Sequence, residues 1–182
     1  ALMQEPVAAV MSVMRINNAD ERFLIYDLGG GTLDIAIADS ISGRVNLLAH
    51  GGIAMCGGRD FDRILFDSVV RPWLLDQFDL PEDFMKNPKF KSLCRTATWA
   101  AEKAKIELSA RDNAVITLSE TESGVRDLSN HEIFLEVPLQ RQTFDKLIAE
   151  RLCETIDCAR ETIDKAGISA DDIAKIVFIG GP

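Results

Sequence analysis

The residues best suited to chemistry lie in one short run, Asp27-Leu28-Gly29-Gly30-Gly31-Thr32-Leu33-Asp34. Three consecutive glycines let backbone N–H groups close on a phosphate, and Thr32 adds a hydroxyl donor. The acids at either end, Asp27 and Asp34, can hold magnesium-bound water. The lysine-serine ending of a Walker loop is absent, and a plain glycine-rich hairpin turn is the alternative. The combination of two acids, glycines and a hydroxyl predicts a site for nucleotide phosphate.

A second set of polar residues lies further along the chain. Glu102, Lys105 and Ser109 are spaced by three and four residues, which places them on one face of a helix. By itself this pattern is more typical of a solvated charged face. Its place after the glycine-rich run makes it a candidate for contacting the rest of a nucleotide.

The glycine-rich run is expected to join two β-strands. Apolar and alternating patterns predict four strands, over residues 22–28, 32–38, 44–50 and 176–179. The first three follow one another closely and predict an antiparallel meander, with a turn at Ser42-Gly43. The last strand leads into Gly180 and Gly181.

Helical periodicity predicts four helices, over residues 5–14, 60–78, 92–108 and 144–166. Thr143 is expected to cap the last helix, and Gly167 to end it. The acidic, proline-bearing segment 79–88 is predicted as a loop. The period falls towards two over residues 113–139, which predicts a small sheet.

The composition of the 182 residues favours a folded globular protein. Apolar residues make up 47% and charged residues 27%, and no apolar run is long enough to cross a bilayer. The net charge of −9 argues against nucleic-acid binding, which needs a basic face. Nucleotide binding stays open, because a glycine-rich loop holds phosphate through local N–H groups. The four cysteines show no zinc or CxxC spacing, so free thiols are expected.

The chain resembles the actin-like ATPases and, within them, the heat-shock 70 kDa (DnaK-type) chaperones. The run from Asp27 to Asp34 is similar to that family's second phosphate loop. Glu5-Pro6-Val7-Ala8-Ala9 resembles the motif that links the family's two lobes. Gly57 to Asp62 resembles the segment leading into an inserted helical subdomain, with Arg59 where the family usually has an acid.

Two further segments carry the resemblance. Ala101 to Ser109 is similar to the family's adenosine-binding helix, with Ile106 where an arginine usually stacks on adenine. Phe178 to Gly181 resembles the beginning of a second adenosine segment.

The resemblance implies ATP or ADP and Mg2+ as cofactors, with K+ as a further ion. It implies a catalytic role for Glu5, Asp27 and Asp34, and magnesium held by Asp27 and, through water, by Glu5. The implied nucleotide-binding residues are Gly29, Gly30, Gly31, Thr32, Gly58, Asp60, Glu102, Lys105, Ser109, Gly180 and Gly181.

The implied fold is α/β, an actin-like ATPase (ribonuclease H-like) lobe with an inserted α+β helical subdomain. Residues 1–56 and 147–182 are expected to form the lobe core, and residues 57–146 the inserted subdomain that contacts adenosine. We expect the chain to be a piece of a longer protein, cut at both ends and lacking the first lobe. Because phosphoryl transfer needs groups from both lobes, the piece alone should be nearly inactive.

For the longer protein, the resemblance implies a cytoplasmic chaperone of protein folding and the stress response. Its ATPase would drive binding and release of client peptides, with a J-domain protein and a nucleotide exchange factor as partners and with neither nucleic acid nor membrane. The alternatives are an actin-like filament protein, a sugar-kinase-like lobe and a degenerate relative that no longer hydrolyses ATP. Arg59 and Ile106 are the residues that favour the degenerate relative.

Overall fold

The computed structural model describes Ala8, Met11 and residues 20–182, and the chain divides into two compact units. We call Ala1–Asp60 with Arg151–Pro182 the sheet unit, and Phe61–Glu150 the helical unit. The boundaries expected from the sequence, 56/57 and 146/147, stay a prediction. The helix expected over residues 5–14 lies outside the described residues, apart from Ala8 and Met11.

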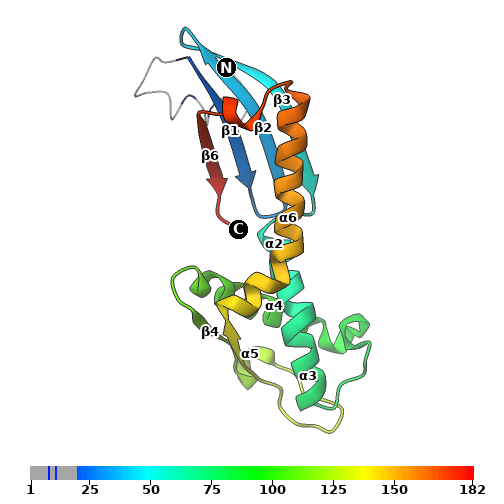
Figure 1. Cartoon of the computed structure of the whole chain (residues 1–182). Coiled ribbons are helices and arrows are strands. Elements are labelled where there is room, and N and C mark those ends of the chain that lie inside the picture. The colour runs from blue at the N-terminus through cyan, green and yellow to red at the C-terminus, as the bar shows by residue number, and fades with distance from the viewer. Residues whose placement is uncertain (1–7, 9–10, 12–19) are drawn as a thin grey trace. The chain divides into compact units, whose positions relative to one another are not determined.

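The sheet unit is built on a mixed four-stranded sheet (Figure 1). Its strands are β1 (Glu21–Leu28), β2 (Thr32–Ile41), β3 (Arg44–Ala54) and β6 (Lys175–Gly180), in the order β3-β2-β1-β6. The first three form the predicted antiparallel meander, and β6 pairs with β1 in parallel. The predicted mixture of helices and strands is therefore confirmed for this unit.

β3 is longer than the sequence suggested, because Gly51 and Gly52 belong to the strand and do not end it. A Cβ added at Gly51 would lie 2.3 Å from the Thr162 hydroxyl, and one at Gly52 would lie 2.7 Å from the Leu33 carbonyl oxygen. Both glycines are therefore required by packing. A glycine pair reads as a strand breaker in sequence, whereas here it marks close approach of neighbouring elements.

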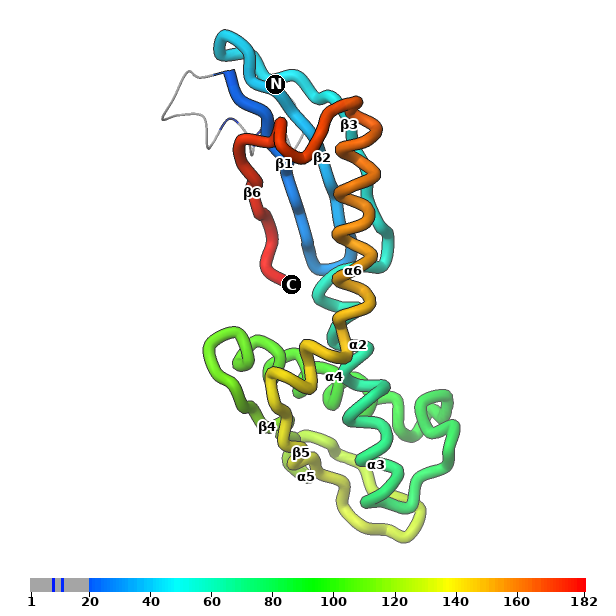
Figure 2. Tube along the Cα trace, in the orientation of Figure 1, coloured from blue at the N-terminus to red at the C-terminus, as the bar shows by residue number. Residues whose placement is uncertain are grey.

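The strand alternation gives the sheet two different faces. One face buries Phe23, Ile25, Ala36 and Ala38, with partly buried apolar side chains from β3 and β6 packed against them. The opposite face receives the C-terminal part of α6 (Arg141–Lys165), where the Tyr26 hydroxyl donates a hydrogen bond to the Thr155 Oγ1 (Figure 2). The end of β1 is thereby held between β2, β6 and a helix.

The helical unit follows α2 (Gly58–Leu65), which begins in the sheet unit. A π-helical turn, η1 (Phe66–Val70), and α3 (Arg71–Gln77) continue it, so the helix predicted over 60–78 is confirmed with a local widening. The segment predicted as a loop, residues 79–88, contains a short 3-10 turn, η2 (Phe84–Lys86), and leads into a second one, η3 (Pro88–Phe90). Phe84 and Phe90 anchor these turns in the core.

The remaining elements of the helical unit agree closely with expectation. α4 (Lys91–Leu108) buries Leu93, Ala97 and Ala101, and two strands, β4 (Asn113–Leu118) and β5 (Leu135–Gln140), pair antiparallel. A short helix, α5 (Glu120–Ser123), lies between them in the chain. The small sheet predicted from the period-two pattern is therefore confirmed.

Thr143 does not cap the long helix, as had been expected from the sequence. α6 begins at Arg141, directly after β5, and the Arg141 N–H donates to the Asp112 carbonyl oxygen at 2.9 Å. This bond satisfies an N-terminal amide without a capping side chain. The last element before β6 is a 3-10 turn, η4 (Ala170–Asp172). Within the described part of the chain, no helix has the length and apolar character needed to span a bilayer.

Candidate phosphate site

The hairpin between β1 and β2 gathers the predicted phosphate residues at one end of the sheet. Asp27 and Asp34 are direct partners across the two strands, and the register continues with Leu28 opposite Leu33. The Gly29 N–H then closes the turn on the Thr32 carbonyl oxygen at 3.0 Å. The Thr32 hydroxyl donates to the Asp34 carboxylate at 3.1 Å. The glycines therefore form the turn, and the two acids and the hydroxyl lie on the strand ends that flank it.

Glycine at positions 29 and 30 is not required by the fold. Neither residue has a left-handed backbone, and an added Cβ would come no closer than 3.7 Å at Gly29 and 3.8 Å at Gly30. Gly30 is exposed, and among the described residues neither its N–H nor that of Gly31 donates a backbone hydrogen bond. A Cβ would therefore fit at either glycine without a clash, and the N–H groups of Gly30 and Gly31 have no backbone acceptor among the described residues.

The segment Gly57 to Arg59 packs against this turn. A Cβ at Gly57 would lie 2.5 Å from both the Gly29 carbonyl oxygen and the Gly31 nitrogen, so only glycine fits there. The N–H of Gly58 donates to the Gly29 carbonyl oxygen at 3.0 Å, and that of Arg59 to the Gly30 carbonyl oxygen at 2.9 Å. The first amides of α2 thus bind the carbonyl groups of the glycine turn and hold it in place.

Arg59 places its side chain against the same turn. Its Nε donates to the Gly30 carbonyl oxygen at 3.3 Å, and its Nη2 is 3.2 Å from the position that a Cβ of Gly31 would take. The side chain is exposed, and no carboxylate of the described residues forms an ion pair with it. Sequence reasoning noted this residue only as a departure from the family pattern.

The end of β6 reaches the same corner of the sheet. Gly180 pairs with Leu28, has a φ of +88°, and leaves 3.3 Å between an added Cβ and the Asp27 Oδ1. An added Cβ would also lie 2.2 Å from the Leu28 carbonyl oxygen, so Gly180 is required by backbone conformation and by packing. Gly181 meets no such restriction. The structure therefore brings Gly180 beside Asp27, as the predicted site requires.

The two carboxylates fit a magnesium ion that keeps most of its water. Like charges placed directly opposite on neighbouring strands repel, so a cation between Asp27 and Asp34 would relieve an unfavourable contact. The described residues contain no group of three or more His, Cys, Asp or Glu side chains suited to a metal. Magnesium bound through one or two carboxylates, water and substrate phosphates suits such a donor set. Glu5, the third predicted acid, lies outside the described residues.

Asp60 takes part in the start of α2. Its N–H donates to the Gly57 carbonyl oxygen at 3.0 Å, and the residue is half-buried. Asp60 and Gly58 both belong to the segment that packs against the glycine turn. The structure thus gives both residues a supporting place in the turn's framework, and their contact with nucleotide stays a prediction.

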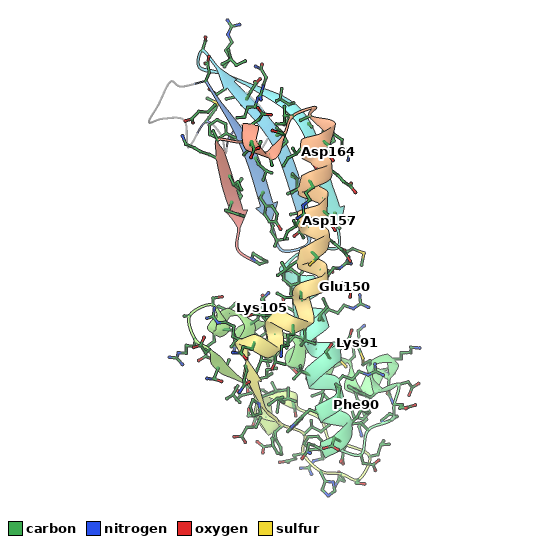
Figure 3. The ribbon with its side chains drawn as sticks, viewed as in Figure 1. Phe90, Lys91, Lys105, Glu150, Asp157 and Asp164 are labelled. Carbon is green, nitrogen blue, oxygen red and sulfur yellow. The ribbon has the colours of Figure 1, made fainter. Side chains whose placement is uncertain are left out.

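The second predicted set lies in the helical unit, on and just after α4 (Figure 3). Lys105 is buried and its Nζ lies 2.8 Å from the Asp62 Oδ1, with side-chain exposures of 8% and 6% for the pair. Burial raises the pKa of Asp62, and the hydrogen bond and charge of Lys105 oppose that rise. Asp62 was missed by sequence reasoning, because nothing in the spacing of α2 and α4 shows that they pack together.

The other two members of this set are more accessible than Lys105. Glu102 is half-buried and Ser109, which follows the last residue of α4, is exposed. Ile106 is 60% exposed. The set predicted to face one side of a helix thus includes one buried cation and two residues open to a ligand.

A protein-family model described as "Hsp70 protein" matches residues 1–182. The match covers the glycine turn, Arg59 and the helix that carries Lys105. The mixed sheet of the structure agrees with the actin-like ATPase fold that such a match implies. The family match and the fold are both consistent with a phosphate site at the glycine turn.

Proposed function

The chain belongs to the Hsp70 family, and from this premise we propose that its sheet unit holds the phosphates of ATP or ADP in an Hsp70-type ATPase domain. The nucleotide would bind with Mg2+ at the end of β1 and β2. Gly30 and Gly31 would supply backbone N–H donors, Gly29 would let the backbone come close to the phosphates, and Thr32 would contribute its hydroxyl. Asp27 and Asp34 would hold water and, through it, the metal ion.

The observation that carries this proposal is the absence of a structural need for glycine at positions 29 and 30. Gly57 and Gly180 leave no room for a Cβ, whereas a Cβ at Gly29 or Gly30 would make only ordinary van der Waals contacts, at 3.7 and 3.8 Å. Glycine in a turn costs conformational entropy, which the fold does not repay at these two positions. Close approach of a ligand to the backbone repays it, as in other phosphate-binding glycine loops.

The chemistry of such a site depends on positioning and electrostatics more than on covalent participation by the protein. ATP hydrolysis forms a bond between the oxygen of water and the γ-phosphorus, while the bond from that phosphorus to the bridging oxygen breaks. Asp27 and Asp34 would accept hydrogen bonds from the attacking water and orient it. Magnesium would supply charge neutralisation of the phosphates. We further propose that Glu5 shares the task of holding metal-bound water.

The adenosine end of the nucleotide is assigned, within this proposal, to Glu102, Lys105 and Ser109. The Glu102 carboxylate is accessible enough to accept a hydrogen bond from a ribose hydroxyl, and the Ser109 hydroxyl to donate or accept one. Lys105 is paired with Asp62, so its main effect would be on the packing of the helical unit. Gly58, Asp60 and Gly181 complete the proposed set of nucleotide-binding residues.

The chaperone role extends the proposal beyond the nucleotide site. Client peptides, a J-domain protein and a nucleotide exchange factor are the partners that we propose, together with a cytoplasmic location. The family match favours this role over a filament protein or a sugar kinase. A degenerate relative that binds no nucleotide is the alternative that experiment must separate, since Arg59 and Ile106 depart from the family pattern.

The proposal is tested by calorimetric titration of ATP, ADP and adenosine with Mg2+ into the full-length protein and its Gly30→Val variant. Because the fold leaves room at Gly30, the variant should keep its thermal unfolding temperature while losing affinity for ATP and ADP. Lys105→Ala is unsuitable here because it leaves Asp62 unpaired in the core. A wild-type protein that binds neither ATP nor ADP would show that the degenerate relative is correct.

A further inference from the structure

We propose that Arg59 is a phosphate-contacting cation of this protein, which binds the terminal phosphates of the nucleotide from the side of α2. The inference rests on the proposed function and adds a residue to it. The charge of Arg59 is opposite to that of the acid which the chaperones resembling this chain usually carry at this position.

The Arg59 guanidinium lies against the glycine turn. Its Nε is bonded to the Gly30 carbonyl oxygen at 3.3 Å, and its Nη2 lies beside Gly31, 3.2 Å from the position of an added Cβ. The side chain therefore lies along the turn whose N–H groups are the proposed phosphate donors. Arg59 also belongs to the sheet unit, so its place beside the turn is internal to one compact unit.

Most hydrogen-bond donors of the Arg59 guanidinium are not used within the described part of the chain. The Nε bond uses one of five N–H donors. Among the described residues, no acidic side chain pairs with Arg59, although the chain carries a net charge of −9. Arginine presents a planar fork that matches phosphate oxygens in a bidentate way. An exposed guanidinium held against a glycine turn is therefore preorganised for an anion and needs little rearrangement to bind one.

The positive charge of Arg59 also balances negative charge at the turn. Asp27 and Asp34 lie directly opposite each other at the same turn, and both repel phosphate. A magnesium ion offsets part of this repulsion, and a second cation beside the turn offsets more. Arg59 is held there by two hydrogen bonds to the same carbonyl, one from its backbone N–H and one from its Nε.

The test compares the ATP, ADP and adenosine affinities of the full-length protein with those of Arg59→Gln, Arg59→Lys and Arg59→Glu, each titrated with Mg2+ by calorimetry. Glutamine keeps an N–H donor for the Gly30 carbonyl oxygen but removes the charge. We expect Arg59→Gln to weaken ATP binding by about tenfold and adenosine binding by less than about twofold, because adenosine has no phosphate. Arg59→Lys should lose less than Arg59→Gln, and Arg59→Glu should lose the most.

The matched control is Arg63→Gln, one turn further along α2. Arg63→Gln makes the same change in net charge as Arg59→Gln. The Arg63 side chain is 73% exposed, and its Nε lies 3.8 Å from the Asp67 Oδ2. This variant should leave all three affinities unchanged. The difference in ATP affinity between wild type and Arg59→Gln should shrink as salt rises, since the contact is exposed.

The outcomes separate this inference from the proposed function. Equal ATP affinity in wild type and Arg59→Gln would overturn the role of Arg59 and leave the nucleotide site standing. An equal loss for ATP and adenosine would overturn it too, because it would reveal a role in loop folding alone. A wild-type protein that binds no nucleotide overturns both proposals together.

Discussion

The sheet unit and the helical unit carry their polar chemistry in opposite ways. In the sheet unit, candidate groups are exposed at a turn, and many of them belong to the backbone of glycine residues. In the helical unit, the central candidate is a side chain, Lys105, that is buried against Asp62. The first arrangement is open to a ligand, whereas the second is already occupied by a partner from the same protein.

Because of this difference, substitutions at the turn should affect ligand binding, and substitutions in the buried pair should affect stability. Substitutions at Gly29 and Gly30 should change what the turn can bind and leave the core intact, since an added Cβ at either position meets no atom closer than 3.7 Å. Substitutions in the buried pair change the core first, because each leaves an uncompensated charge in a medium of low dielectric constant. The four predictions below test this contrast, beginning with the largest effect.

Removing one member of the buried pair should give the largest loss of stability. We expect Lys105→Met to lower the free energy of unfolding by about 3–5 kcal/mol, as for other buried charges left without a partner. The double variant Lys105→Met with Asp62→Leu should recover most of the loss. Urea unfolding provides the measurement. The exposed pair Arg111–Glu107 is the control, and its loss through Arg111→Met should cost at most about 1 kcal/mol.

A smaller loss is expected within the sheet unit, at the glycine that supports the turn. Gly57→Ala would place a Cβ 2.5 Å from two backbone atoms of the turn. Overpacking of this kind costs about 1–3 kcal/mol and should also displace the phosphate donors. Thermal unfolding and ATP titration would show both effects. Gly29→Ala, with 3.7 Å of clearance, should leave unfolding unchanged; equal destabilisation by the two substitutions would contradict this account.

The two units should also differ in how one aspartate in each responds to pH. Burial raises the folded-state pKa of Asp62, so its contribution to stability is greatest below the ordinary aspartate pKa and declines as pH rises through the raised value. Hydrogen bonds from Ser169, its backbone N–H first, together with Arg22, lower the pKa of Asp172. Its contribution is present above the ordinary pKa and is lost as pH falls through the lowered value.

Urea unfolding across pH, with Asp62→Asn and Asp172→Asn, tests these opposite slopes. Relative to wild type, Asp62→Asn should remove a decline in stability towards higher pH, and Asp172→Asn should remove a gain. Slopes of the same sign for the two variants would show that burial does not govern Asp62.

The smallest effect on stability is expected at Ile106, the exposed apolar residue of α4. Ile106→Arg should change the free energy of unfolding by no more than about 0.5 kcal/mol, because the residue lies at the surface. It should tighten adenosine and ATP binding alike, through stacking of a guanidinium on adenine. Calorimetry with both ligands provides the check. A gain for ATP alone would place the new arginine near the phosphates, against the proposed arrangement.

Much of the fold follows from local pattern. The meander, α4, the two-stranded sheet and β6 are all visible in the sequence, because apolar residues recur with the period of each element. The two misses have non-local causes. Gly51-Gly52 looks like a breaker but continues β3, and Thr143 looks like a cap but lies inside α6. In both places a contact with a distant residue, Thr162 or Asp112, decides the backbone.

The sequence by itself determined the family and the residues of the glycine turn, because they are consecutive and a two-stranded hairpin must bring Asp27 and Asp34 face to face. Tertiary structure alone decided which glycines the fold requires and which serve a ligand, since that depends on atoms far along the chain. It also decided that Lys105 is buried against Asp62 and that Arg59 lies along the turn. Residue spacing carries no information on such contacts, which exist only once separate elements have packed.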